Sequence, residues 1–182
     1  MRVVDIRRDD AFLTDALTEL SFAAAARHAP NWLPTLERAR ATVLDATDAG
    51  HIARVLQGED GVPLGWVAAE HTYSAVWEIH PLLVGVEHHG RGYGTRLVAD
   101  IESRIEARGG AVAFVSTSDE TESTSLSNVD LYRDPAGALA ALDVQPGHAL
   151  GFWRRVGYTV VGMIPDAEGP GMPSIHLCKR LG

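Results

Sequence analysis

Apolar residues recur along this chain at helical and at strand spacings in turn. Leu13, Leu17, Leu20 and Ala24 lie three or four residues apart, which predicts one face of a helix. Shorter apolar runs bounded by turn-forming residues predict strands. The full pattern predicts strand 2–6, helices 10–27 and 35–46, strands 52–56, 64–69 and 76–86, helix 95–107, strand 111–116, helix 147–155, and strands 159–164 and 174–178. This order predicts a mixed α/β fold.

A strand, a glycine-rich turn and a helix follow one another in the middle of the chain. The apolar run Leu82–Val86 precedes His89–Thr95, in which glycine occupies positions 90, 92 and 94. The backbone N–H groups of such a turn can surround an anion at the positive end of the next helix. A phosphate-bearing ligand is therefore expected, with a plain tight turn as the alternative. The spacing is not that of a P-loop or of the G-x-G-x-x-G dinucleotide site.

The turn resembles the acetyl-CoA pyrophosphate loop of the GNAT superfamily of N-acetyltransferases, Arg/Gln-x-x-Gly-x-Gly/Ala. Gly92 and Gly94 match that pattern, while His89 stands where Arg or Gln is usual. Phe152–Tyr158 resembles a second family motif, F-Y-x-K-x-G-F, and follows in the family's order. The resemblance runs from about Arg2 to Leu181. It implies a single GNAT domain over 1–182, with a central mixed, mostly antiparallel sheet, a splayed parallel strand pair and flanking helices.

The same resemblance implies acetyl-CoA as co-substrate. Its pantetheine arm would pair with the backbone of Val84 and Val86. The remaining expected cofactor-binding residues are His89, Gly90, Arg91, Gly92, Tyr93, Gly94, Thr95 and Trp153. Trp153 occupies the place of a Tyr that protonates the departing thiolate in many relatives, and an indole cannot supply that proton. Tyr132 and Tyr158 are alternative acids, and an unassisted thiolate is a third option.

Composition and charge narrow the partners. The chain has 182 residues, 46% of them apolar, which suits one domain with a substantial core. A net charge of −8 argues against nucleic acid and favours cationic ligands. No apolar run approaches a membrane span, and the N-terminus lacks a signal-peptide pattern. The single cysteine, Cys178, is interpreted as a packed, unreactive thiol, and a cytoplasmic location is expected.

Residues 119–145 form an acidic insertion after the strand predicted at 111–116. The segment contains six acidic residues, and Arg133 is its one basic residue. It follows the C-terminal end of a central strand, where ligands bind in open sheets. The sequence therefore predicts binding of a cationic acceptor by this insertion. A solvated acidic loop is the alternative.

Three segments resemble the aminoglycoside 6′-N-acetyltransferases: Trp77–Val84, Thr117–Thr121 and Gly162–Gly171. This resemblance implies a polycationic amino sugar as acceptor and a role in antibiotic resistance. Several carboxylates would bind such an acceptor through charge-assisted hydrogen bonds. The expected substrate-binding residues are His28, Trp32, Glu78, Asp119, Glu120 and Asp130.

Acetyl transfer to an amine requires that the ammonium first lose a proton. Glu78 and His80 lie two residues apart on a predicted strand and so share a face, and Asp119 follows the next strand. These three are the candidates for the base or for holding a water, and Tyr132 completes the predicted catalytic set. An exposed polar strand face is the alternative for Glu78 and His80. No third ligand accompanies them, so no metal is expected.

Other functions stay open at this point. The acceptor could be a polyamine or a peptide amine instead of an aminoglycoside. Trp153 in place of the family's Tyr favours a non-catalytic acyl-CoA-binding module, and a dinucleotide-binding protein is a more distant option. Relatives often dimerise, which makes a homodimer an expectation.

Overall fold

The computed structural model describes the backbone of residues 1–182 and every side chain except that of His28. The elements in chain order are β1 (Arg2–Asp5), α1 (Ala11–His28), α2 (Leu36–Ala46), β2 (Ile52–Gln57), β3 (Pro63–Tyr73), β4 (Val76–Val84), η1 (Val86–His88), α3 (Tyr93–Ala107), β5 (Val112–Ser118), α4 (Pro135–Ala140), α5 (Ala149–Arg155), β6 (Thr159–Ile164) and β7 (Ser174–Arg180). The mixed α/β class with mostly antiparallel strands is confirmed.

The chain divides into two compact units. The first unit contains Met1–Ala113 and Arg180–Gly182, and the second contains Phe114–Lys179. Within the first unit the strand order is β1-β2-β3-β4, and within the second it is β5-β7-β6. Within the described chain, no helix combines the length and apolar character needed to cross a bilayer.

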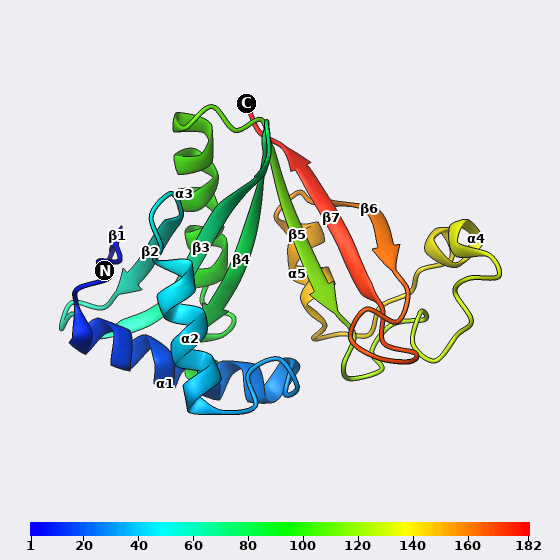
Figure 1. Ribbon diagram of the computed structural model, residues 1–182, viewed down its shortest axis with the longest axis horizontal. Helices are drawn as coiled ribbons and strands as arrows, with labels where there is room; N and C mark the ends of the chain where they lie inside the picture. The colour runs from blue at the N-terminus through cyan, green and yellow to red at the C-terminus, as the bar shows by residue number, and fades with distance from the viewer. The chain divides into compact units, whose positions relative to one another are not determined.

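Helices cover both faces of the sheet in the first unit (Figure 1). Val55 of β2 packs in a cluster with Leu17 of α1 and Val43 of α2. The adjacent residue of the strand, Arg54, reaches Asp100 of α3. Because successive strand residues point to opposite faces, α1 and α2 cover one face and α3 covers the other. The helical spacing that predicted α1 placed its apolar side correctly, since Leu13 and Leu17 are buried.

Arg54 is a buried cation that the sequence analysis did not identify. Its side chain is 3% exposed, and it donates to Asp100 Oδ2 at 2.6 Å, to Asp5 Oδ1 at 2.5 Å and to the Val3 carbonyl at 3.2 Å. Burial lowers the pKa of Arg54, but hydrogen bonds and charge from the two carboxylates outweigh burial and raise it. These contacts tie β1, β2 and α3 together.

Strand β4 contains an irregularity that the sequence did not reveal. Val67 of β3 pairs with Leu82, whereas Ala69 pairs with Ile79, so β4 has one extra residue between these pairs. Before the irregularity, Ile79 is buried and His80 is exposed. The extra residue changes the alternation of faces, and Leu83 accordingly packs against the cluster that contains Leu33.

Two boundaries around β3 and β4 differ from the prediction. Strand β3 continues to Tyr73, because its polar end pairs with β4 in a hairpin that the apolar pattern could not detect. The prediction that the following strand extends to Val86 was wrong. The Gly85 N–H donates to the Leu64 carbonyl at 3.0 Å, and the 3-10 turn η1 begins at Val86.

The second unit carries β6 and β7 as an antiparallel pair, with Thr159 opposite Cys178. The bounds of β6 agree with the prediction. Helix α4 lies within the insertion 119–145, where no helix was predicted. Burial raises the pKa of the Cys178 thiol, in agreement with its interpretation as unreactive.

Candidate active site

The glycine turn forms a loop of open backbone ahead of α3. Gly90 and Gly92 have φ angles of 75° and 79°, a left-handed conformation that glycine adopts without strain. Gly92 is the N-cap of α3 and makes no side-chain capping bond. No other atom lies within 4 Å of a Cβ placed at either glycine. The loop therefore presents N–H groups and space at the positive end of a 15-residue helix, which fits a pyrophosphate.

The other predicted loop residues surround this turn. The Val84 carbonyl accepts a hydrogen bond from Nε2 of His89 at 3.0 Å, which fixes the His89 ring to the end of β4. Tyr93 packs against His88 with ring centroids 5.9 Å apart. Arg91 and Thr95 are exposed. Side chains thus support or flank the loop, and its centre is backbone.

Trp32 and His80 are far apart in the sequence, but their rings are in contact in the first unit. Their ring centroids lie 5.1 Å apart in an edge-on arrangement. Part of the His80 side chain is exposed to solvent, but protein atoms surround the rest of it. The resulting desolvation lowers the pKa of His80 from 6.5, and the negative charge of Glu70 partly offsets this shift. Its imidazole is consequently neutral at neutral pH and able to accept a proton. Glu78 is half-buried two residues earlier, and the predicted side chain of His28 lies outside the described residues.

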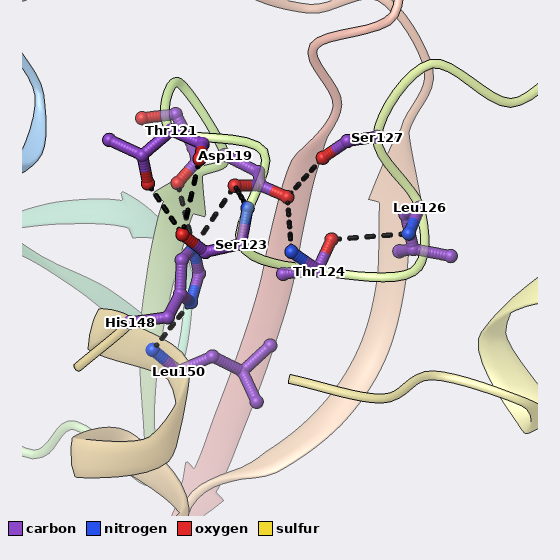
Figure 2. A network of polar contacts seen from close by, with 9 residues as sticks. Asp119, Thr121, Ser123, Thr124, Leu126, Ser127, His148 and Leu150 are labelled. Carbon is purple, nitrogen blue, oxygen red and sulfur yellow. Dashed lines mark hydrogen bonds and ion pairs between the residues drawn. The ribbon is translucent and has the colours of Figure 1, made fainter. Parts of the chain in front are cut away.

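Asp119 is enclosed at the end of β5 in the second unit (Figure 2). The residue is 1% exposed. Its Oδ1 accepts the Ser123 N–H at 2.7 Å, and its Oδ2 accepts the Thr124 N–H at 2.8 Å and the Ser127 hydroxyl. Burial raises the pKa of Asp119, but these hydrogen bonds outweigh it and lower the pKa. The carboxylate is thus charged and committed to its own loop, a geometry that favours organising the loop over proton transfer.

His148, which the sequence analysis did not identify, extends this network. Its Nδ1 accepts the Leu150 N–H at 3.1 Å and so caps α5. Nε2 therefore carries the hydrogen and donates to the Ser118 carbonyl at 3.1 Å. The same nitrogen lies 4.0 Å from Asp119 Oδ1. His148 thus connects the end of β5 to the start of α5.

The remaining predicted residues of the second unit are spread between surface and core. Asp130 is exposed and accepts the Tyr132 N–H at 3.2 Å, and Tyr132 is 70% exposed. Glu120 is half-buried. Trp153 is buried, with its ring centroid 5.0 Å from that of Tyr158. Tyr158 is enclosed, whereas Tyr132 reaches solvent.

Comparison with known proteins identifies the family. The model of the acetyltransferase (GNAT) family matches residues 15–138, more than half of the chain. The chain belongs to the acetyltransferase (GNAT) family. The family and fold expected from the glycine loop and the Phe152–Tyr158 motif are thereby confirmed. A search of curated proteins found no match to this chain.

Several solved structures are similar over nearly the whole chain. An aminoglycoside 6′-N-acetyltransferase complexed with coenzyme A is 26% identical with a TM-score of 0.87, and covers 99% of this chain and 97% of its own. The aminoglycoside 6′-N-acetyltransferase from Enterococcus faecium is 28% identical with a TM-score of 0.85 and the same coverage. The ribosomal-protein-S18-alanine N-acetyltransferase from Escherichia coli, 11% identical with a TM-score of 0.67 and covering 100% of this chain and 94% of its own, shares the fold alone.

Proposed function

We propose that this chain transfers an acetyl group from acetyl-CoA to the 6′-amine of an aminoglycoside. The observation that carries the proposal is the similarity, over 99% of the chain, to two aminoglycoside 6′-N-acetyltransferases with TM-scores of 0.87 and 0.85. Antibiotic resistance, a cytoplasmic location and a homodimer are expectations that accompany it.

The glycine loop supports acetyl-CoA as the donor. Its N–H groups and the N-terminus of α3 suit the pyrophosphate, and the open space at Gly90 and Gly92 lets the backbone approach it. The backbone at Val84 and Val86 would face the pantetheine arm. Acetyl-CoA, when bound, supplies an activated thioester. The protein groups hold the donor and orient it toward the amine.

His80 and Glu78 are the proposed proton-handling pair. The neutral His80 imidazole can take the proton from the arriving ammonium at a ring nitrogen. The Glu78 carboxylate, on the same strand, would attract that ammonium or hold a water. Trp32 stacks on the sugar ring in this proposal, and its edge contact fixes His80. Tyr132, Tyr158 or no acid at all serves the departing thiolate.

The acidic insertion is the proposed source of selectivity for polycations. Apart from Asp119 and the half-buried Glu120, its carboxylates are exposed. Exposed carboxylates attract and orient a polycation at the cost of little desolvation. Glu120 and Asp130 are the proposed acceptor contacts.

The first test is thiol release from acetyl-CoA against a panel of amines. The panel contains aminoglycosides with a free 6′-amine, matched aminoglycosides with a 6′-hydroxyl, spermidine and a peptide. Release that requires the 6′-amine is the expected result. Thiol release only with spermidine or the peptide would show that the acceptor is not an aminoglycoside. Binding of acetyl-CoA without thiol release would show that the protein is an acyl-CoA-binding module.

A second test concerns the proton-handling pair. We expect Glu78→Gln and His80→Asn each to lower kcat about 100-fold, the lower end of general-base contributions, with acetyl-CoA affinity unchanged. His71→Asn is the control, because His71 is an exposed histidine of β3 that also packs beside a tryptophan, 5.3 Å from Trp77. Normal turnover in both active-site variants would remove the pair from the mechanism.

A further inference from the structure

Among the six acidic residues of the insertion 119–145, Asp119 is the one that the structure buries. The other five are half-buried or exposed. The carboxylates of three of them each accept one hydrogen bond from a nearby backbone N–H group. Asp130 accepts from Tyr132, Asp134 caps α4 by accepting from Gly137, and Asp143 accepts from Val144. Asp119 instead accepts from three residues along the insertion, and both of its oxygens are used.

These contacts lie at the base of the insertion. The Gln145 N–H donates to the Ser123 carbonyl at 2.8 Å, and Ser125 N–H donates to the Asp143 carbonyl at 3.0 Å. The two ends of the insertion are therefore joined at Ser123, whose N–H donates to the Asp119 carboxylate. Leu126 is 1% exposed and anchors the same turn. The carboxylate thus closes a loop from which the exposed acidic residues project.

We propose that Asp119 is a positioning residue, which sets affinity for the acceptor by clamping the insertion 119–145 to the end of β5 and does not itself take the proton from the amine. The inference rests on the proposed function, because it assumes that the insertion binds the acceptor. Asp119 acts through the carboxylates that the clamped insertion presents. Its oxygens already accept hydrogen bonds from Ser123, Thr124 and Ser127, and the residue is 1% exposed, so the carboxylate is poorly placed to receive an ammonium.

The test compares Asp119→Asn and Ser127→Ala with Asp143→Asn. Asp143→Asn removes the same charge from the same insertion, and it leaves in place the Asp119 contacts and the backbone bonds between Asp143 and Ser125. We expect Asp119→Asn to raise KM for the aminoglycoside about tenfold and Ser127→Ala about threefold, as loss of hydrogen bonds to a buried charge predicts. In both variants, kcat and the KM for acetyl-CoA should stay within about twofold of the wild type, and the pH profile should keep its shape. Asp143→Asn should change the KM for the aminoglycoside by less than Ser127→Ala does.

Trypsin provides a readout that needs no substrate. Arg133 is exposed and is the one basic residue between 119 and 145, so cleavage after it reports opening of the insertion. We expect faster cleavage at Arg133 in Asp119→Asn and Ser127→Ala than in Asp143→Asn or the wild type. Ser127→Ala keeps the test valid if Asp119→Asn fails to fold.

The outcomes separate the two proposals. A fall in kcat of about 100-fold with unchanged KM, a lost limb of the pH profile and unchanged trypsin cleavage would make Asp119 the base and overturn the inference. Faster cleavage with unchanged KM would also overturn it, because the insertion would then not bind the acceptor. A wild-type enzyme that acetylates no aminoglycoside would refute the proposed function first, and trypsin cleavage would still decide whether Asp119 clamps the insertion.

Discussion

The glycine loop His89–Thr95 and the insertion 119–145 each begin shortly after a strand, yet they are ordered by opposite means. The loop presents backbone N–H groups, and its conformation depends on glycines at positive φ. The insertion is held by a side chain, Asp119, which gathers backbone and hydroxyl donors from residues 123–127. A site for an anion thus needs little more than local sequence, whereas the acidic surface depends on one enclosed carboxylate.

Desolvation also has opposite outcomes in the two units. Desolvation of His80 lowers its pKa and leaves the imidazole neutral. Desolvation of Asp119 would favour the neutral acid, but its hydrogen bonds lower the pKa and keep it charged. Partners, rather than burial alone, decide the charge state. One group is therefore suited to accepting a proton and the other to ordering a loop.

The largest expected effect tests the backbone character of the glycine loop. Gly92→Val should raise the Kd of acetyl-CoA about 100-fold, because a β-branched residue at φ 79° is strained and its side chain occupies the open space beside the N–H groups. Calorimetric titration with acetyl-CoA measures the change. Gly61→Val is the matched control, since Gly61 has φ 82° and equally open surroundings in the β2–β3 hairpin. Equal affinities in the two variants would contradict the assignment of the loop.

The next effect separates His80 from Asp119 by pH. As pH falls through the lowered pKa of His80, kcat/KM should decline about tenfold per unit, and His80→Asn should lose this limb. The Asp119 clamp should persist over the same range, which slow amide hydrogen exchange at Ser123 and Thr124 would report. Loss of protection in step with activity would mean that the two groups are not independent.

The sign of each stability contribution follows from the direction of its pKa shift. His80 binds protons less readily in the folded state, so its contribution becomes unfavourable as pH falls below 6.5. Asp119 has a folded-state pKa below 3.8. Its contribution is fully present above 3.8 and is lost as pH falls through the folded-state value. Mild acid therefore affects His80 first.

The smallest effect tests how the insertion rests on the loop before β7. A Cβ at Gly171 would lie 2.6 Å from Asn128 Oδ1 and 3.1 Å from Asn128 Cα, and φ is 74°. Gly171→Ala should destabilise this contact by about 1 kcal/mol and speed trypsin cleavage at Arg133 about fivefold. Gly109→Ala, at φ 81° with no atom within 4 Å, carries similar strain away from the insertion and should leave that cleavage unchanged.

Much of the fold followed from local pattern. Helical spacing in 10–27 and apolar runs at 52–56 and 159–164 gave α1, β2 and β6 to within one or two residues. The extra residue in β4 could not be predicted from the sequence, because it is defined by the pairing of β4 with β3. The same is true of Arg54, since its partners Asp5 and Asp100 are distant in sequence. The splay of a parallel strand pair stays a prediction.

The candidate site divides in the same way. The sequence by itself determined the family, through the motifs His89–Thr95 and Phe152–Tyr158. Their glycines and aromatic residues are tied to local backbone conformation and to the end of a helix. It also indicated the pair Glu78 and His80, since a strand places alternate residues on one face. Only the tertiary structure decided that Trp32 lies against His80, and that Asp119 is enclosed and accepts hydrogen bonds on both oxygens. Solvation and hydrogen-bond partners come from folding, and they determine what a carboxylate or an imidazole can do.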